Sequence, residues 1–453
     1  MWLFPFAGKK AIERRVLAAF RRAIRSQETY RQFLSAHGVM PKTIKTLSDF
    51  SSRVPPVSKK ALFGSGSFAS FSVPGYKKQL SSMYTSSGFT RSFAFGESSR
   101  KEHGPAASFM EDFLFRLYDL NPGDTLVINA LSLGTDIPLR RIPQVHTGVR
   151  QDSVIETVRK AKGEFNTIVL VGEPHLLKRI VEDGIRENIR WDSMNVLVVT
   201  GSEFITESWR IYIETCLGKG RVISTMGITE VGLAMCFETH PLIELRRCAA
   251  KDNTFRDVVC GPGTKAVPLL MHYLPGLYHI EAAGNSGVRG EMLVTCLSHS
   301  RLVPLVRYST GDQVLLLSLE ELSSRLGNTP LPQGFLQGLP TALVWGRLQQ
   351  LNIPGGDWIS PLEVKDALFT SHAVAEKVTG NFRLVQKKAG GPVKLTVQLS
   401  PGEKSNRTIQ RFLQEGLAVH TQTPIPVTLA VYREFPYGFE HDFERKNQYI
   451  GSE

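Results

Sequence analysis

Residues 167–224 read TIVLVGEPHLLKRIVEDGIRENIRWDSMNVLVVTGSEFITESWRIYIETCLGKGRVIS, and this stretch decides the fold. It contains three short apolar runs typical of buried strands, and two segments of helical periodicity separate them. Runs and segments alternate along the chain at 167–172, 175–185, 195–201, 205–217 and 221–224. Strands that alternate with helices over short loops predict a parallel, doubly wound α/β sheet.

Two loops follow strands of this sheet, Gly201-Ser202-Glu203 and Met226-Gly-Ile-Thr-Glu230. They are candidate binding segments, because ligands of such sheets bind beyond the carboxyl ends of the strands. Thr229 would donate a hydrogen bond to a phosphate, and Glu230 would hold Mg²⁺, which prefers carboxylate and phosphate oxygens. Taken alone, Glu230 fits the plainer interpretation of an acid beside a helix N-terminus better.

The regions on either side of the sheet differ in character. Apolar residues at helical spacing predict a helical segment at 10–36. Near residue 347 the pattern changes to strands and helices typical of a compact α+β domain. We therefore expect a large α/β domain with parallel sheet layers at 1–346. A small mobile α+β domain follows at 347–453, joined through a hinge at 347–349.

Composition is that of an ordinary globular protein, since 42% of the 453 residues are hydrophobic and 21% are charged. No run approaches the roughly 18 apolar residues of a membrane span, and the apolar start is too short for a secretory signal. We expect a cytoplasmic protein without a membrane partner. Five cysteines without a CxxC pair are typical of reduced thiols. A zinc site at Cys236, His240 and Cys248 is conceivable, but no second close ligand pair completes it.

The net charge of +12 raises the question of nucleic acid. Apart from a basic start between Lys9 and Arg25, the basic residues are scattered, and no RNP-like or zinc-finger motif accompanies them. We expect no nucleic-acid partner. A solvated basic surface explains the charge, and it would also attract anionic substrates.

The chain has no Walker A, GxGxxG, HExxH or GxSxG motif, so phosphate binding would need another device. The candidate is the loop Thr85-Ser-Ser-Gly-Phe-Thr-Arg-Ser92. Its glycine permits close approach of the backbone, its hydroxyls donate hydrogen bonds, and Arg91 adds positive charge. Alone, such a run is weak evidence, because Ser, Thr and Gly are common in loops.

Three further segments contain charged residues that would contact a nucleotide. The run Pro304-x-x-Arg307-Tyr-x-Thr-Gly-Asp312 places Asp312 after a tight turn, where its carboxylate would accept both hydroxyls of a ribose. An ordinary turn explains this run equally well. Arg347 lies at the change of composition and Lys446 lies in the tail. By themselves they fit a linker and a solvated lysine.

In this order, the motifs resemble the adenylate-forming superfamily of acyl-CoA synthetases. The most specific match is Arg307-Tyr-x-Thr-Gly-Asp312. Within the superfamily the chain looks most like the phenylacetate-CoA ligase branch. Segments near the N-terminus also resemble that branch: Tyr30-Arg31, Gly38-Val39, Leu47-x-Asp-Phe50 and Val54-Pro-Pro-Val-Ser-Lys59. The resemblance runs nearly from end to end.

The resemblance implies where ATP would bind. The loop residues that would clasp the β- and γ-phosphates are Thr85, Ser86, Ser87, Gly88, Thr90, Arg91 and Ser92. Ser202 and Glu203 would border the adenine. Asp312 would hold the ribose hydroxyls, with Arg347 alongside.

The resemblance also implies how an acid would be activated. Gly227 would line the acyl pocket, Thr229 would bind the α-phosphate, and Glu230 would be the Mg²⁺ ligand. Lys446 would bridge the attacking carboxylate and the α-phosphate, and Arg307 is counted with the catalytic residues. Attack of one anion on another needs neutralisation and alignment more than proton transfer. Members of the superfamily then rotate the C-terminal domain about the hinge to admit a thiol.

Several positions depart from the superfamily pattern. In the phosphate loop Phe89 replaces a hydroxyl, Arg91 stands where glycine is usual, and Ser92 stands near the usual lysine. Met226 replaces an aromatic residue, and Gln349 lies in the hinge where an acid is common. Arg91 would still supply positive charge to the phosphates.

The leading hypothesis is ATP-dependent activation of an aryl or small hydrophobic acid as acyl-AMP, followed by transfer to CoA or to the phosphopantetheine thiol of an acyl carrier protein. One alternative delivers the acyl group to an amine- or hydrazine-type acceptor, and another is a catalytically silent nucleotide-binding relative. Retention of Glu230, Asp312 and Lys446 argues against a silent protein. The sequence leaves the acid, the acceptor and the oligomeric state open.

Overall fold

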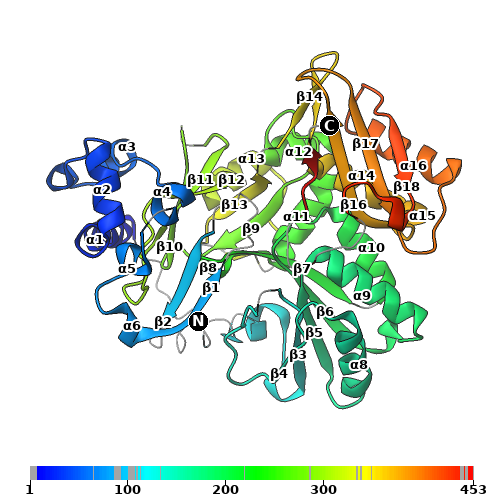
Figure 1. Cartoon of the computed structure of the whole chain (residues 1–453), viewed down its shortest axis with the longest axis horizontal. Helices are drawn as coiled ribbons and strands as arrows, with labels where there is room; N and C mark the ends of the chain where they lie inside the picture. The colour runs from blue at the N-terminus through cyan, green and yellow to red at the C-terminus, as the bar shows by residue number, and fades with distance from the viewer. Residues whose placement is uncertain are drawn as a thin grey trace.

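The computed structural model describes residues 8–64, 66–85, 93–99, 108, 111–112, 114–132, 134–218, 220–284, 287–332, 335–336, 339–347, 349–438, 443 and 447–451. Figure 1 shows N-terminal helices on the left, a large sheet in the middle and a separate smaller sheet at the upper right. We call residues 8–347 the N-terminal lobe and residues 349–451 the C-terminal lobe. Within the described ranges, no helix combines the length and apolarity needed to span a bilayer.

A mixed sheet forms the centre of the N-terminal lobe, and over the described residues it has 11 strands in the order β10-β11-β12-β13-β9-β8-β7-β6-β5-β3-β4. Their bounds are β3 Thr125–Asn129, β4 Gln144–His146, β5 Thr167–Gly172, β6 Asn195–Thr200, β7 Arg221–Ile228, β8 Gly232–Phe237, β9 Leu269–Tyr273, β10 Tyr278–Ala282, β11 Gly290–Cys296, β12 Tyr308–Leu317 and β13 Thr341–Arg347. Strands β4, β3, β5, β6 and β7 run parallel. From β7 to β10 the neighbours are antiparallel. The predicted parallel α/β sheet is confirmed.

Helices cover the outer face of the parallel strands, with bounds α8 Gln151–Ala161, α9 Pro174–Arg186 and α10 Glu207–Leu217. The indole Nε1 of Trp191 donates a hydrogen bond to the carbonyl of Val181 on α9 at 3.0 Å. A Cβ at Gly184 would lie 2.6 Å from the same ring, so α9 approaches Trp191 this closely only because residue 184 is glycine. The opposite face of the parallel strands carries a second apolar cluster, which includes Val127, Val169 and Ile223.

The antiparallel half of the sheet has its own cover, with bounds α11 His240–Lys251, α12 Asn253–Cys260 and α13 Leu319–Leu326. In the parallel half, short 3₁₀ turns lie before β3 at Pro122–Asp124 and before β6 at Trp191–Ser193. A further apolar cluster lies under α11, α12 and α13, with Leu270, Leu315 and Leu343 of the sheet among its members.

The N-terminal region packs on the far end of the sheet, with bounds α1 Lys9–Ser26, α2 Glu28–Ala36, η1 Pro41–Thr43, α3 Leu47–Arg53, α4 Lys59–Phe63, α5 Phe68–Phe71, α6 Tyr76–Gln79, β1 Leu80–Thr85 and β2 Phe95–Ser99. The helical segment expected at 10–36 is two helices, because the backbone at Gln27 is extended. The buried amide of Gln27 donates to the carbonyl of Phe71, which holds the break in place. Val57 forms a β-bridge with Tyr308, so this region is joined directly to β12.

The C-terminal lobe has a four-stranded sheet of its own over the described residues, in the order β18-β17-β16-β19. The bounds are β14 Leu351–Ile353, β15 Asp357–Ile359, α14 Pro361–Thr370, α15 His372–Ala375, β16 Val378–Gln386, β17 Val393–Leu399, α16 Arg407–Ala418, β18 Val427–Ala430, η4 Tyr432–Glu434 and β19 Ile450–Gly451. The expected α+β architecture is confirmed. The boundary after residue 346 and the mobility of this lobe stay predictions.

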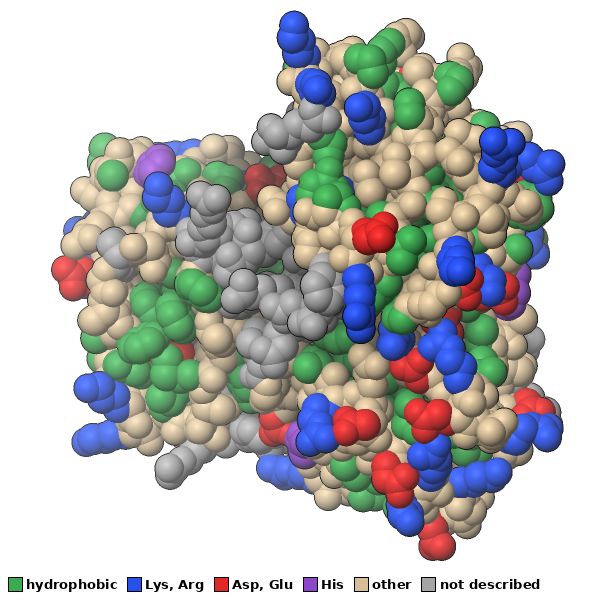
Figure 2. Space-filling view, turned by 45° about the vertical axis from the view of Figure 1, so that its right-hand side comes forward, with side chains coloured by type: hydrophobic (Ala, Val, Ile, Leu, Met, Phe, Trp, Pro, Cys, Tyr) green, Lys and Arg blue, Asp and Glu red, His purple; other side chains and the backbone are tan. Residues whose placement is uncertain are grey.

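Charged side chains of both signs are mixed on the face shown in Figure 2. Exposed ion pairs combine the two signs, such as Arg190 with Asp192 at 2.9 Å. On this face the basic residues therefore do not form one continuous patch.

Candidate active site

The turn between β7 and β8 carries Thr229 and Glu230. The Glu230 residue is 2% exposed, and its Oε1 accepts a hydrogen bond from the hydroxyl of Tyr308 on β12. The guanidinium of Arg301 donates to the backbone carbonyls of Glu230 and Val231. Both the backbone and the side chain at this turn are therefore held in place.

The second carboxylate oxygen of Glu230, Oε2, is buried and accepts no hydrogen bond from the residues that the structure describes. A buried carboxylate oxygen without a partner costs free energy. A divalent cation removes this cost, since carboxylate oxygens are ordinary Mg²⁺ ligands and phosphates complete the coordination. The residues at the turn therefore fit a magnesium ion.

Lys59, at the start of α4, ends the segment Val54–Lys59 that resembles the superfamily branch, but the sequence assigned it no role in the site. Burial lowers the pKa of its ammonium group, Glu230 raises it and Arg347 lowers it, with a net shift below the ordinary value. Lys59 thus lies within electrostatic reach of the turn and of the end of β13. The Val57–Tyr308 bridge brings it there, and this contact between distant segments leaves no trace in local sequence.

Strands β1 and β2 carry the ends of the predicted phosphate loop. Thr85 closes β1 and pairs with Phe95. A Cβ at Gly96 would lie 2.1 Å from the carbonyl oxygen of Thr229, so β2 contacts the turn only because residue 96 is glycine. The remaining loop residues lie outside the described residues: Ser86, Ser87, Gly88, Thr90, Arg91 and Ser92.

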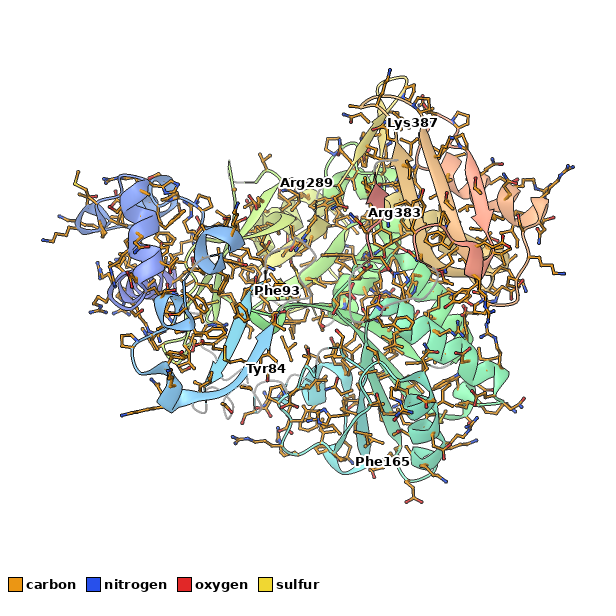
Figure 3. All side chains as sticks on the ribbon, viewed as in Figure 1. Tyr84, Phe93, Phe165, Arg289, Arg383 and Lys387 are labelled. Atoms are coloured by element: carbon orange, nitrogen blue, oxygen red, sulfur yellow. The ribbon has the colours of Figure 1, made fainter. Side chains whose placement is uncertain are left out.

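A cavity of about 460 Å³ opens beside the turn. Ser202, Gly227 and Thr229 line it, so the structure brings three of the sequence-predicted residues together. The apolar wall is one face of the parallel strands and includes Val127, Val169, Val199 and Ile223. Tyr84, labelled in Figure 3, faces the cavity from the β1–β2 hairpin.

Asp312 and Arg347 lie opposite each other on β12 and β13. Asp312 is 9% exposed, and its backbone N–H donates to the hydroxyl of Thr310 at 3.1 Å. Gly346, with a φ of 74°, brings β13 against the ring of Phe204, next to the Gly201–Glu203 loop. Arg347 also lines a second cavity of about 390 Å³ at the junction of the two lobes.

Arg307 has contacts away from the cavity. Its guanidinium donates to the carbonyl of Val54 and to Oε2 of Glu281, the latter at 3.2 Å. These contacts fasten the N-terminal region to β10. The structure thus places Arg307 in packing, and it is not among the residues that line the cavity.

Glu203 turns toward the C-terminal lobe. Its carboxylate accepts hydrogen bonds from Lys365 at 2.7 Å and from the hydroxyl of Tyr449 at 2.6 Å. Its neighbour Ser202 lines the cavity, whereas Glu203 does not. Lys446 lies outside the described residues, one position before Asn447.

A buried ion network supports the turn from below. Arg210 donates to both carboxylate oxygens of Glu238 at 2.7 Å and to Glu207 at 3.0 Å. Oε2 of Glu238 also accepts from the backbone N–H of Ser224 at 2.7 Å. Because Ser224 lies in β7 and Glu238 directly follows β8, the network fixes both strands that carry the turn.

Comparisons with known proteins agree with this geometry. No family model matches the sequence, and no curated protein matches it. The chain superposes on 2-hydroxyisobutyryl-CoA ligase in the postadenylation state in complex with R3-HIB-AMP, with a TM-score of 0.73 at 16% identity, over 98% of this chain and 89% of that one. The chain has the fold of the adenylate-forming ligases. An anthranilate CoA ligase in complex with anthranoyl-AMP gives a TM-score of 0.52 at 14% identity, over 81% of this chain and 66% of that one.

The adenylate-forming ligase fold confirms the resemblance at the level of architecture, and the phenylacetate-CoA ligase branch stays a prediction. The neighbouring hydroxyisobutyryl-CoA ligase has also been solved in an open conformation and in the thioesterification state. Against these states the TM-score falls to 0.60 and 0.58, although 98% of this chain is covered each time. Since coverage is constant, the arrangement of the parts differs, and this chain is arranged more like the postadenylation state.

Proposed function

We propose that this chain is an adenylate-forming ligase that joins a carboxylic acid to the AMP part of ATP and then passes the acyl group to a thiol. The observation that carries the proposal is the buried carboxylate of Glu230, whose Oε2 has no partner within the described part of the chain, next to Thr229 at the edge of the cavity. Lys59 and Arg347 add positive charge close to this carboxylate. Such a turn suits a nucleotide phosphate with its metal ion.

In the first step a carboxylate oxygen attacks the α-phosphorus, and the bond from that phosphorus to pyrophosphate breaks. Thr229 would donate a hydrogen bond to the α-phosphate, and Glu230 would hold Mg²⁺, which supplies charge neutralisation on the phosphates. Lys446 would bridge the two reacting anions. In this chain Ser92 stands near the position of the usual lysine of the phosphate loop. The ammonium group of Lys59, which interacts with Glu230, would supply positive charge to the phosphates instead.

The nucleoside would lie across the carboxyl ends of the central strands. Asp312 and Arg347, opposite each other on adjacent strands, would hold the ribose hydroxyls. Ser202 would border the adenine. The residues Thr85 to Ser92 would clasp the β- and γ-phosphates from the hairpin that contacts the turn.

The walls of the cavity favour an aryl or small hydrophobic acid. Its apolar side chains come from the parallel strands and would bury the acyl group, while the polar end at Thr229 receives the carboxylate. The acceptor thiol would be that of CoA or of phosphopantetheine on a carrier protein. In that second step the thiol sulfur attacks the acyl carbon, AMP leaves, and the thiol proton is released.

The test is ATP–pyrophosphate exchange with Mg²⁺ across a panel of aryl, amino and fatty acids. Exchange with one class of acid is expected, and it should be lost in Glu230→Gln and in Lys446→Ala. Glu415→Gln serves as control, because this exposed acid lies on the outer helix of the C-terminal lobe. Binding of ATP without exchange for any acid would contradict the proposal and favour the silent relative.

A second assay separates the acceptors. With the acid found by exchange, AMP release is measured with CoA, with a phosphopantetheinylated carrier protein and with simple amines. Release that needs a thiol supports the proposal. Release with amines alone would assign the chain to amide-bond synthesis.

A further inference from the structure

The two lobes meet through a buried set of polar side chains that the proposed chemistry does not use. We call Glu173, His175, Glu203, Lys365 and Tyr449 the interlobe cluster. The first three belong to the N-terminal lobe, at the ends of β5 and β6, and the other two belong to the C-terminal lobe. The side chains of these residues are at most 13% exposed where they form ion pairs.

Glu203 is the centre of the cluster. Its Oε2 accepts from Lys365 Nζ at 2.7 Å and from the Tyr449 hydroxyl at 2.6 Å, and its Oε1 accepts from the backbone N–H of Asn447 at 3.3 Å. The Lys365 ammonium also lies over the ring of Tyr449, 4.5 Å from its centre. One carboxylate of the N-terminal lobe thus binds three groups of the C-terminal lobe.

His175 adds a second link between the lobes. Its Nε2 lies 2.8 Å from the Tyr449 hydroxyl and 3.5 Å from Oε2 of Glu203. Because that hydroxyl donates to Glu203, it accepts from His175. A Cβ at Gly380 on β16 would lie 2.6 Å from Nδ1 of His175, so the C-terminal lobe comes this close only with glycine there.

The cluster is balanced without a metal ion. One ligand atom each from Glu173, His175 and Glu203 lies within 4.8 Å of the others, a spacing that also suits a metal. The ammonium group of Lys365, however, already pairs with Glu203. Burial lowers the pKa of His175, but Glu173 and Glu203 outweigh burial and raise this pKa above the ordinary value. The carboxyl groups of Glu173 and Glu203 thus face the Lys365 ammonium and the His175 imidazole, and burial together with Glu203 raises the pKa of Glu173.

The cluster also fixes the end of the chain beside the predicted catalytic lysine. Lys446 immediately precedes Asn447, whose N–H donates to Glu203. The carbonyl of Tyr449 accepts from Leu384 N–H at 2.7 Å, and β19 pairs with β16. Residues 447–451 are thus held between the N-terminal lobe on one side and the small sheet on the other.

We propose that Glu203, His175 and Tyr449 are positioning residues that hold the C-terminal lobe in the arrangement for acid activation and must separate before the acyl group passes to a thiol. The proposal rests on the proposed function. Its structural basis is the set of contacts across the lobes together with the closer match to the postadenylation state than to the thioesterification state of the neighbour. Separation would leave the Glu203 carboxylate without its partners, and this free-energy cost favours the closed arrangement of the lobes.

The half-reactions test this inference through Tyr449→Phe, which removes only the hydroxyl between His175 and Glu203. With the aryl acid that gives the fastest wild-type exchange, this variant is expected to lose at least tenfold in exchange rate. Transfer from the chemically prepared adenylate of that acid to CoA should keep its rate or increase. An equal loss in both half-reactions, or no loss in exchange, would overturn the proposal.

Ser208→Ala is the matched control. Ser208 also crosses between the lobes, but within the described residues its side-chain hydrogen bonds go to Thr206 and to Asp366, the latter at 2.7 Å, and not to residues 447–451. Its exchange rate should stay within about twofold of wild type. A loss as large as that of Tyr449→Phe would show that any weakening of the interface suffices, which contradicts a specific role of the cluster.

Hydrogen exchange measured by mass spectrometry gives a readout that needs no activity. The peptide that contains residues 447–451 should lose protection in Tyr449→Phe and in Glu203→Gln, and should keep it in Ser208→Ala. Unchanged protection in both cluster variants would overturn the inference even if the ligase activity is confirmed. Lost protection in a protein that exchanges no pyrophosphate would reject the proposed function while the contact across the lobes stands.

Discussion

The hydroxyl of Tyr308 donates to the carboxylate of Glu230 across the central sheet. Tyr308 begins β12, Glu230 follows β7, and in the described sheet β13, β9 and β8 lie between these strands. Both side chains are nearly inaccessible to solvent. One contact therefore joins the Thr-Glu loop to the Arg-Tyr-x-Thr-Gly-Asp segment, two of the sequence motifs of the proposed site.

Tyr308→Phe should weaken the use of Mg²⁺. The change leaves Oε1 of Glu230 without its donor, and a hydrogen bond to a charged group contributes about 1.5–3 kcal/mol, equivalent to about tenfold or more in rate or affinity. Exchange measured against Mg²⁺ concentration should show a higher half-saturating concentration. Tyr30→Phe is the control, since the buried Tyr30 hydroxyl has no hydrogen-bond partner among the residues that the structure describes. An identical Mg²⁺ dependence in both variants would contradict the role of Tyr308.

Much of the fold could be predicted from the sequence because its signal is local. The strands at β5, β6 and β7 are buried on both faces and therefore read as unbroken apolar runs. In the antiparallel half only some strands show this pattern, since β9 and β11 are buried almost throughout and other strands are not. For example, β10 and β12 mix buried and half-buried positions, so their place beside β11 depends on tertiary contacts.

Candidate site residues could be predicted from the sequence only where they belong to a recognisable motif. Thr229 and Gly227 line the cavity, because both belong to the loop after a buried strand, and their roles stay predictions. Lys59 could not be found, since only the packing of α4 on β12 brings it to Glu230. Arg307 belongs to the most specific motif, yet its guanidinium contacts Val54 and Glu281, and its catalytic role stays a prediction.

Glu238→Gln should destabilise the N-terminal lobe. It removes the charge of one of the two carboxylates that the fully buried Arg210 contacts, the other being Glu207, and of the carboxylate that accepts from the Ser224 N–H. Removing one member of a buried ion pair typically costs about 3–5 kcal/mol. Urea unfolding followed by circular dichroism should show a lower midpoint. Glu415→Gln removes an exposed carboxylate that faces Arg411 and should change the midpoint little. A wild-type midpoint for Glu238→Gln would contradict the structural role of the network.

Gly96→Ala should separate β2 from the turn. The added Cβ would overlap the carbonyl of Thr229, which is backbone and cannot move aside as a side chain would. We expect weaker ATP binding by calorimetry, because β2, which follows the predicted phosphate loop in sequence, no longer packs on Thr229. Gly123→Ala is the control, since the nearest atom to its Cβ would be 3.8 Å away. Equal ATP affinity in the two variants would show that β2 does not contribute to the nucleotide site.

Lys59→Met should raise the concentration of ATP needed for exchange. Removing a half-buried cation near Glu230 and Arg347 takes positive charge from the proposed phosphate site. Lys60→Met is the control, because Lys60 is exposed on the same short helix. The expected result is a higher KM for ATP with little change in the KM for the acid. The same KM for ATP in both variants would contradict a role of Lys59 in binding the phosphates of ATP.

The interlobe cluster should give residues 447–451 a pH dependence with a defined sign. Burial would lower the pKa of His175, but Glu173 and Glu203 outweigh burial and the opposing charge of Lys365, so the pKa is raised. Closed lobes therefore favour protonated His175. Its contribution is complete below the pKa of the separated state, near 6.5 for an ordinary histidine, and is lost as pH rises through the raised value. Burial likewise opposes charge on Glu203, yet Lys365 and His175 hold its pKa well below the ordinary value, so its contribution is lost only as the solution becomes acidic.

Hydrogen exchange of the peptide with residues 447–451, corrected for the intrinsic effect of pH, measures this dependence. Protection in the wild type should fall as pH rises through the raised pKa of His175. In His175→Gln the fall should be absent, because the amide can still donate to the Tyr449 hydroxyl but does not titrate. The Tyr449 hydroxyl does not confuse the result, since burial and the nearby Glu203 hold its pKa well above the ordinary value. An identical pH profile in the variant would mean that His175 carries no charge between the closed lobes.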